Sequence, residues 1–138
     1  MIKEINSTKA YSILQQSGNA VLIDVRSSME FKYVGHPSNA IHIPIKEPPG
    51  WETSANFINN VQVELEKKFS NIQNMSDINI LLLCRSGKRS EEAALMLEAE
   101  GYKNIINIVD GFEGDKDANN HRSVLNGWRF NNLPWEQD

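Results

Sequence analysis

The sequence predicts an α/β fold in which a parallel sheet is covered by helices on both faces. Short apolar segments typical of buried strands alternate with segments in which apolar residues recur at helical spacing. Strands that alternate with helices form parallel sheets, because the helices supply the crossover connections that parallel strands need. With 138 residues, the chain has the length of one domain, spanning 1–138.

Four apolar segments fit buried strands, and a further one fits a short strand at an edge of the sheet. The buried segments are 20–25, 40–43, 78–84 and 105–109, and the edge segment is 2–5. The buried segments are nearly continuous in apolar residues, which is expected where helices cover both faces.

Capping residues mark where helices begin between these strands. Ser7 is expected to cap a helix that ends before Gly18. Ser27 and Glu30 form a capping box, which predicts a short helix that ends near Gly35.

Two longer helices are predicted in the second half of the chain. Apolar residues recur at helical spacing after Ser54, namely Phe57, Ile58, Val61, Leu65 and Phe69. The other helix begins within 88–90 and ends at Glu100, where Gly101 suits a left-handed cap. Residues 110–138 are expected to form a long loop and a C-terminal tail whose tryptophans pack on the domain.

Composition and charge exclude several classes of protein. Hydrophobic residues make up 40% and charged residues 23%, as in folded globular proteins, and no apolar run approaches the roughly 20 residues of a membrane span. The formal net charge of −4 argues against general nucleic-acid binding, although a local site can still bind a small anion. Residues 1–6 lack the apolar stretch of a secretory signal, so the cytoplasm is the expected location.

The only cysteine, Cys84, ends an apolar strand and is followed by a polar loop and a helix. Ligands of open α/β sheets bind at the carboxyl ends of strands, where this thiol is expected. Amide groups of the loop around Gly87, together with the helix N-terminus, form a cradle for negative charge. Arg85, Lys88 and Arg89 add cations that an ordinary helix start would not carry. The pattern favours a nucleophilic thiolate in an anion-binding pocket over a cysteine that only fills the core.

Three separated motifs resemble those of single-domain rhodaneses, which are sulfurtransferases. The first is the loop 84–90. The second is the segment 22–44, which contains Asp24-Val25-Arg26, Glu30-Phe31 and Gly35-His36, and the third comprises the closing segments 109–112 and 127–135. The chain departs from the Gly-His-Ile-Pro-Gly-Ala pattern of the family at 37–39, which alters a loop. The resemblance covers nearly the whole chain and implies a rhodanese-like α/β fold with a central parallel five-stranded sheet.

The resemblance implies a double displacement through Cys84. The thiolate takes the outer sulfur of thiosulfate or a similar small anionic donor, and a thiol, cyanide or protein acceptor removes it from the resulting persulfide. The residues expected to bind the donor and the persulfide are Arg85, Ser86, Gly87, Lys88, Arg89 and Ser90. Asp24 and Arg26 are expected to brace this loop, and the reaction needs no metal or organic cofactor.

Other functions remain open at this point. The same cysteine could serve a persulfide carrier that passes sulfur between proteins with little thiosulfate turnover. Phosphatases and arsenate reductases of similar architecture carry arginine at the position of Ser90, whereas this chain has Arg89 one residue earlier and therefore a shorter loop. An interaction domain with an idle pocket would not depend on Cys84.

The remaining polar motifs are expected to be structural. His36, His42 and His121 match no metal-ligand spacing. The segment 115–126 resembles the start of a calcium loop but lacks its glycine and its final glutamate, so we expect a polar loop. The sequence leaves open whether Trp51 or Trp128 lines the thiol pocket.

Overall fold

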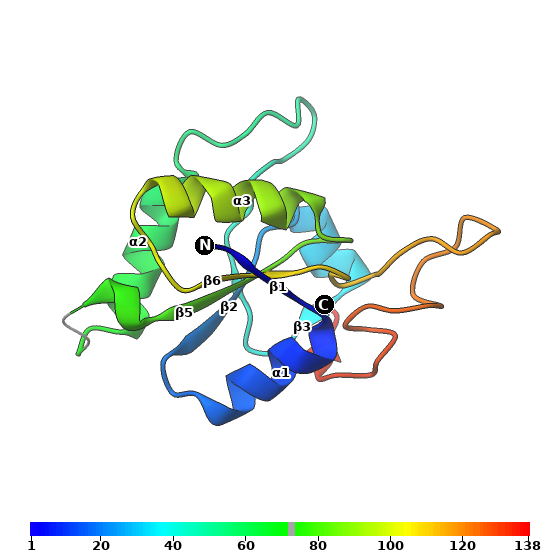
Figure 1. Ribbon diagram of the computed structural model, residues 1–138. Helices are drawn as coiled ribbons and strands as arrows, with labels where there is room; N and C mark the ends of the chain where they lie inside the picture. The colour runs from blue at the N-terminus through cyan, green and yellow to red at the C-terminus, as the bar shows by residue number, and fades with distance from the viewer. Residues whose placement is uncertain (72–73) are drawn as a thin grey trace.

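A computed structural model describes residues 1–71 and 74–138, and its strands and helices alternate along the chain (Figure 1). The strands are β1 Lys3–Ile5, β2 Ala20–Asp24, β3 His36–Pro37, β4 Ile41–His42, β5 Asn79–Leu83, β6 Ile105–Ile108 and β7 Trp135–Glu136. The α-helices are α1 Ser7–Gln16, α2 Phe57–Lys68 and α3 Lys88–Ala99, with a π-helix η1 at Glu30–Val34 and a 3-10 helix η2 at Met75–Asp77.

The predicted five-stranded parallel sheet is confirmed. Its strand order is β1-β6-β5-β2-β4, and every neighbouring pair is parallel. β2 and β5 run in register from Ala20 beside Asn79 to Asp24 beside Leu83. Because these two strands end side by side, Asp24 and Cys84 lie at the same edge of the sheet.

Helices cover both faces of the sheet, as the sequence predicts. In Figure 1, α2 and α3 lie on one face and α1 lies on the other. Val61 of α2 and Leu97 of α3 belong to one buried apolar cluster, whereas Ala10 of α1 packs with Phe112 and Trp128 in a second. Within the described ranges, no helix has the length and apolar character needed to cross a membrane.

The start of α1 differs from the expectation that Ser7 caps it. Asn6 is the cap, because its side-chain oxygen accepts the backbone N–H of Lys9 at 2.9 Å. Ser7 is the first helical residue, and both its N–H and its hydroxyl donate to the Asp110 carboxylate at 2.8 Å. Asn and Ser are both good helix caps. Because Asp110 binds Ser7 through the Ser7 N–H and hydroxyl, the capping position falls to Asn6.

The predicted capping box is present, but the helix that follows it is a π-helix. The Ser27 N–H donates to the Glu30 carboxylate at 3.3 Å, and the Glu30 N–H donates to the Ser27 hydroxyl at 3.4 Å. The π-helix η1 ends at Gly35, whose φ of +111° is open to glycine. At the end of α3, Gly101 adopts the predicted left-handed conformation with φ +97°.

Candidate active site

The Cys84 thiol lies between the end of β5 and the start of α3 and is 1% exposed. The Gly87 N–H donates to its sulfur at 3.1 Å, and the Ser90 hydroxyl oxygen lies 3.2 Å from the same atom. The loop therefore turns back over the sulfur and places an amide donor and the first turn of α3 beside it.

The close turn of this loop depends on glycine at position 87. Gly87 has φ +106°, and a Cβ atom there would lie 2.6 Å from the carbonyl oxygen of Val109. The loop can therefore press against the end of β6 only because this residue has no side chain. That approach brings the Gly87 N–H into hydrogen-bond distance of Cys84.

The segment 111–114 packs behind the loop and binds its carbonyl groups. The Phe112 N–H donates to the Cys84 carbonyl at 2.8 Å, and the Glu113 N–H donates to the Arg85 carbonyl at 3.0 Å. Since N–H and C=O point in opposite directions across a trans peptide, the amides that follow these carbonyls point away from segment 111–114. The loop amide that the structure places on the sulfur is that of Gly87, and a loop amide in this position favours negative charge on the sulfur.

Arg89 forms an ion pair with Glu30 at the side of the loop. The two guanidinium nitrogens donate to the two carboxylate oxygens at 2.7 and 2.9 Å. Burial disfavours the Glu30 carboxylate, but the hydrogen bonds and charge of Arg89, with help from Ser27, outweigh it and lower the pKa of Glu30 to about 2. The hydrogen bonds to Glu30 also raise the pKa of Arg89, and the Cys84 sulfur adds to this effect.

Glu30 was not predicted as part of the site. The capping box accounts for a glutamate at this position, so no local pattern indicates a second role. The carboxylate serves both the Ser27 cap and Arg89. The charge of Arg89 was expected to attract an anionic donor, and the structure shows that Glu30 compensates it.

An open cavity of about 570 Å³ lies in front of the loop. It is lined by Ser27, Met29, Glu30, Val34, Pro48, Trp51, Arg85, Arg89 and Glu113. The lining includes two arginines and two glutamates, so the formal charges of the lining residues balance, and Arg89 is paired with Glu30. Lys88 was expected to bind the donor but is exposed on α3 and is not among the lining residues.

Asp24 and Arg26 form a fully buried ion pair at the end of β2. The Arg26 Nη2 donates to Asp24 at 2.6 Å and to the carbonyl of Gly35 at 2.7 Å. The Arg26 guanidinium also lies 4.4 Å from the ring centre of Phe112, whose N–H binds the Cys84 carbonyl. The pair therefore reaches the loop through Phe112.

Asn107 is a buried polar residue that contacts the loop around the thiol, and it belongs to no motif of the sequence. It lies on β6, next to Leu82 of β5, and is 1% exposed. Its side chain contacts the Ser90 hydroxyl at 2.5 Å and the Gly87 carbonyl at 3.2 Å. The available signal was an asparagine in a strand whose other residues, within 105–108, are isoleucine.

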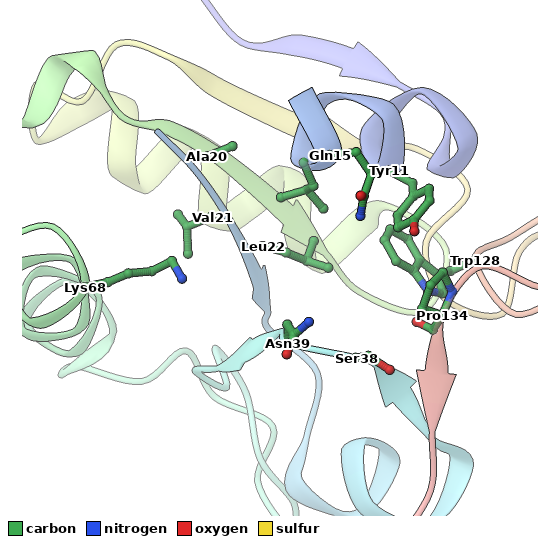
Figure 2. Close-up of a pocket in the computed structure, with 11 residues that line it drawn as sticks. Tyr11, Gln15, Ala20, Val21, Leu22, Ser38, Asn39, Lys68, Trp128 and Pro134 are labelled. Atoms are coloured by element: carbon green, nitrogen blue, oxygen red, sulfur yellow. Dashed lines mark hydrogen bonds between the residues drawn. The ribbon is translucent and has the colours of Figure 1, made fainter. Parts of the chain in front are cut away.

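A second cavity, of about 300 Å³, lies on the α1 side of the sheet (Figure 2). Trp128 and Tyr11 line one side of it, and Lys68 reaches toward it from the end of α2. The loop 84–90 contributes no lining residue to it. Of the two tryptophans left open by the sequence, Trp51 therefore lines the cavity that Arg85 and Arg89 of the loop also line, and Trp128 lines the other. Cys84 itself is not among the lining residues of either cavity.

The histidines and the acidic loop lie apart from the thiol. His36 and His42 both stack on Phe31, with ring centres 3.8 and 4.3 Å away. Asp117 closes a polar turn by accepting the N–H groups of His121 and Asn119, and these hydrogen bonds lower its pKa. Within 1–71 and 74–138, no group of three or more His, Cys, Asp or Glu side chains is placed to hold a metal ion.

Comparison with known proteins finds relatives over the whole chain. A family model described as a rhodanese-like domain matches residues 7–118. An uncharacterized protein of Rickettsia prowazekii is 40% identical, over 99% of this chain and 98% of that protein. The thiosulfate sulfurtransferase GlpE of Haemophilus influenzae is 30% identical, over 81% of this chain and 86% of that protein.

A solved structure extends this similarity to the fold. The crystal structure of Rv0390 from M. tuberculosis matches with a TM-score of 0.79 and 30% identity. The match covers 99% of this chain and 98% of that one, so it includes the tail as well as the sheet.

Proposed function

The chain belongs to the rhodanese-like domain family, and from this premise we propose that it is a sulfurtransferase that carries sulfane sulfur on Cys84. The observation that carries the proposal is the position of the thiol. Cys84 lies at the carboxyl edge of the sheet, its sulfur accepts the Gly87 N–H, and its loop lines an open cavity. Thiosulfate or a similar anion is the proposed small-molecule donor.

The first half of the proposed reaction loads the cysteine. The Cys84 thiolate attacks the outer sulfur of thiosulfate, a new S–S bond forms, and the bond from that sulfur to the sulfonate breaks. Sulfite leaves with the electron pair of the broken bond, and the negative charge of the thiolate passes to the outer sulfur of the persulfide. The loop amides and the N-terminus of α3 are placed to stabilise this charge.

The second half of the reaction returns the thiolate. A thiolate or cyanide attacks the outer sulfur, and the S–S bond to Cys84 breaks with its electron pair remaining on the cysteine. A cavity of about 570 Å³ has room for an acceptor larger than cyanide. We therefore propose a thiol acceptor, either a small molecule or a protein. All of these steps proceed without a metal or organic cofactor.

The first turn of α3 supports sulfur transfer over phosphate or arsenate chemistry. Ser90 stands where a phosphatase loop would carry arginine, and its hydroxyl is bound inside the protein to Asn107. Arg89, one residue earlier, is bound to Glu30. Neither residue is free to clamp a tetrahedral oxyanion in the way such loops require.

Steady-state transfer of sulfur from thiosulfate to cyanide tests the proposal. We expect a saturable dependence on thiosulfate, with formation of sulfite and thiocyanate in equal amounts. Cys84→Ser should lose all activity, while the control variant Ser70→Ala, at an exposed serine just after α2, should retain it. Equal activity of Cys84→Ser and the unchanged protein would refute the proposal.

A persulfide carrier is a second candidate, and the charge balance of the cavity favours it. Arg85 and Arg89 are offset by Glu30 and Glu113, so the site has less attraction for a divalent anion than a cluster of free cations would have. A carrier would load slowly from thiosulfate and rapidly from the persulfide of another protein or a small thiol. Measuring the loading rate from both kinds of donor distinguishes a carrier from an enzyme that uses thiosulfate.

The cytoplasm is the location that we propose for this activity. Reducing compartments keep thiols available, and the proposed nucleophile is the only cysteine of the chain. Fractionation of the native cell, with detection of the protein by antibody, tests this location.

A further inference from the structure

We propose that Asn107 is a positioning residue that withholds the Ser90 hydroxyl proton from the Cys84 sulfur. This inference deepens the proposed function, on which it rests for the identity of the nucleophile. Asn107 is buried among apolar neighbours on β6, where an amide persists only if its polar atoms are bonded. Both ends of this amide contact the loop around the thiol.

The orientation of the Asn107 amide follows from its partner on the loop. One end of the amide lies 3.2 Å from the carbonyl oxygen of Gly87, which can only accept a hydrogen bond. The nitrogen must therefore face Gly87, and the oxygen must face the Ser90 hydroxyl, 2.5 Å away.

This orientation decides where the single proton of Ser90 goes. The Asn107 oxygen carries no proton, so the short hydrogen bond between the two residues uses the proton of the serine. Toward Cys84, 3.2 Å away, the hydroxyl then presents only lone pairs. A neutral thiol can donate its S–H to those lone pairs, but a thiolate has nothing to donate and must compete with Asn107 for the serine proton.

The arrangement suits two of the three states of the cysteine. The neutral thiol is satisfied as a donor to Ser90. In the persulfide, the negative charge has moved to the outer sulfur, so the inner sulfur needs no donor from Ser90. Only the thiolate is deprived of a hydrogen bond from Ser90, which leaves it the Gly87 N–H, and a less stabilised thiolate is a stronger nucleophile toward the sulfur donor.

The charged and titratable groups at this end of the sheet must stay constant in a test. They are the Asp24–Arg26 and Glu30–Arg89 pairs, Arg85, His42 and Asp110, and Arg89 interacts with the Cys84 sulfur through its charge. Replacing Asn107 with leucine changes none of these charges, but it removes the hydrogen bond to the Gly87 carbonyl as well as the one from Ser90. The effect of the Ser90 hydroxyl is therefore isolated by repeating the substitution in a variant that lacks this hydroxyl.

The test measures the rate of iodoacetamide alkylation of Cys84 as a function of pH. In Asn107→Leu, Ser90 is free to donate its proton to the thiolate. A hydrogen bond to a charged group predicts that the midpoint of the profile falls by about one pH unit. The rate at the high-pH plateau should fall by about threefold, because a better stabilised thiolate is a weaker nucleophile. A loop that is merely disordered would not lower both quantities together.

Two further variants make the test specific to Ser90. The fall in the midpoint should disappear when Asn107→Leu is combined with Ser90→Ala, because no Ser90 hydroxyl then remains to donate a hydrogen bond to the thiolate. Ser90→Ala alone should not raise the midpoint, because the hydroxyl gives the thiolate no proton while Asn107 holds it. This variant keeps the proposal testable if the leucine variant fails to fold, since a raised midpoint in Ser90→Ala would overturn the inference. An unmoved or raised midpoint in folded Asn107→Leu would overturn the inference, as would a fall that persists without the serine hydroxyl.

The alkylation profile does not depend on sulfur transfer. If the unchanged protein gained no sulfur from any donor, the proposed function would fail, yet the midpoints would still decide the role of Asn107. If sulfur transfer proceeds and the midpoints do not move, only the inference about Asn107 fails.

Discussion

Glu30 is the single residue whose charge most changes how the site should treat an anionic donor. Its carboxylate holds the Arg89 guanidinium through paired hydrogen bonds at 2.7 and 2.9 Å. The positive charge of Arg89 is therefore compensated by Glu30 before any donor binds. The site depends on loop amides and the start of α3, more than on free cations, to hold an anionic sulfur.

The first prediction follows from this pairing. Glu30→Gln removes the compensating charge and leaves Arg89 to act on the donor, so thiosulfate should load Cys84 between about threefold and tenfold faster at low salt. The measurement is the single-turnover rate of sulfite release at several salt concentrations. Glu91→Gln is the matched control, because Glu91 lies in the first turn of α3 beside Arg89 and its side chain is exposed. A loading rate no higher in Glu30→Gln than in the control would contradict the compensation.

At the scale of elements, the thiol depends on the close approach of the loop to the end of β6. We predict that Gly87→Ala reduces sulfur loading by at least about tenfold, because its Cβ would lie 2.6 Å from the Val109 carbonyl and alanine is strained at φ +106°. Gly18→Ala is the control, since a Cβ at that position meets no atom within 4 Å. Loading rates and urea unfolding curves check the prediction. Equal loading by both variants would show that the close turn is not needed.

The link between η1 and α3 should also appear as a dependence of stability on pH. The pKa of Glu30 is about 2 in the folded protein against 4.5 for the free side chain, so its ionised form stabilises the fold at pH values above 4.5. That contribution is lost as the pH falls from 4.5 toward 2. We predict that the difference in free energy of unfolding between the unchanged protein and Glu30→Gln is largest near pH 7 and shrinks over this window. Urea unfolding at several pH values measures it, and a difference that stays constant with pH would contradict the ion pair.

The strands and helices were predictable from sequence where one local pattern dominates. The segments 20–25 and 78–84 are nearly continuous in apolar residues, and they form the neighbouring strands β2 and β5. The cap of α1 was not predictable, because Asn6 and Ser7 are both good caps and Asp110, far along the chain, binds Ser7. Local patterns specify elements, whereas contacts between distant segments decide their ends.

The same distinction holds for the candidate site. The loop around Cys84 was visible because its residues are contiguous. The partner of Arg89 was not, since Glu30 lies 59 positions away and has a complete local explanation in its capping box. The contacts of Asn107 were not predictable for another reason: a single asparagine in a strand does not show which residues it will contact in the fold.

At the scale of the whole molecule, the C-terminal tail secures the segment behind the thiol. Trp128 donates two hydrogen bonds, both at 2.9 Å: its backbone N–H binds the Gly111 carbonyl, and its indole N–H binds the Pro134 carbonyl. The ring is 1% exposed and meets Tyr11 of α1 edge to face. The tail thereby joins α1 to the segment that binds the carbonyls of the loop.

Replacing this ring should weaken both the fold and the site. We predict that Trp128→Ala lowers the free energy of unfolding by about 3–5 kcal/mol and slows sulfur loading, because the segment that begins at Gly111 loses its support. Phe130→Ala is the control, since Phe130 is 46% exposed and should have little effect on either quantity. Urea unfolding and single-turnover loading measure the two effects. Comparable losses in both variants would contradict a specific role for Trp128.

The central claim is that Cys84 carries the transferred sulfur, and intact mass tests it most directly. The reduced protein is incubated with thiosulfate, freed of excess donor and weighed beside Cys84→Ser. We predict a gain of about 32 Da, the mass of one sulfur atom, in the unchanged protein only, and its loss on addition of cyanide. A gain of the same mass in Cys84→Ser would contradict the claim, as would no gain in the unchanged protein from thiosulfate or from any persulfide donor.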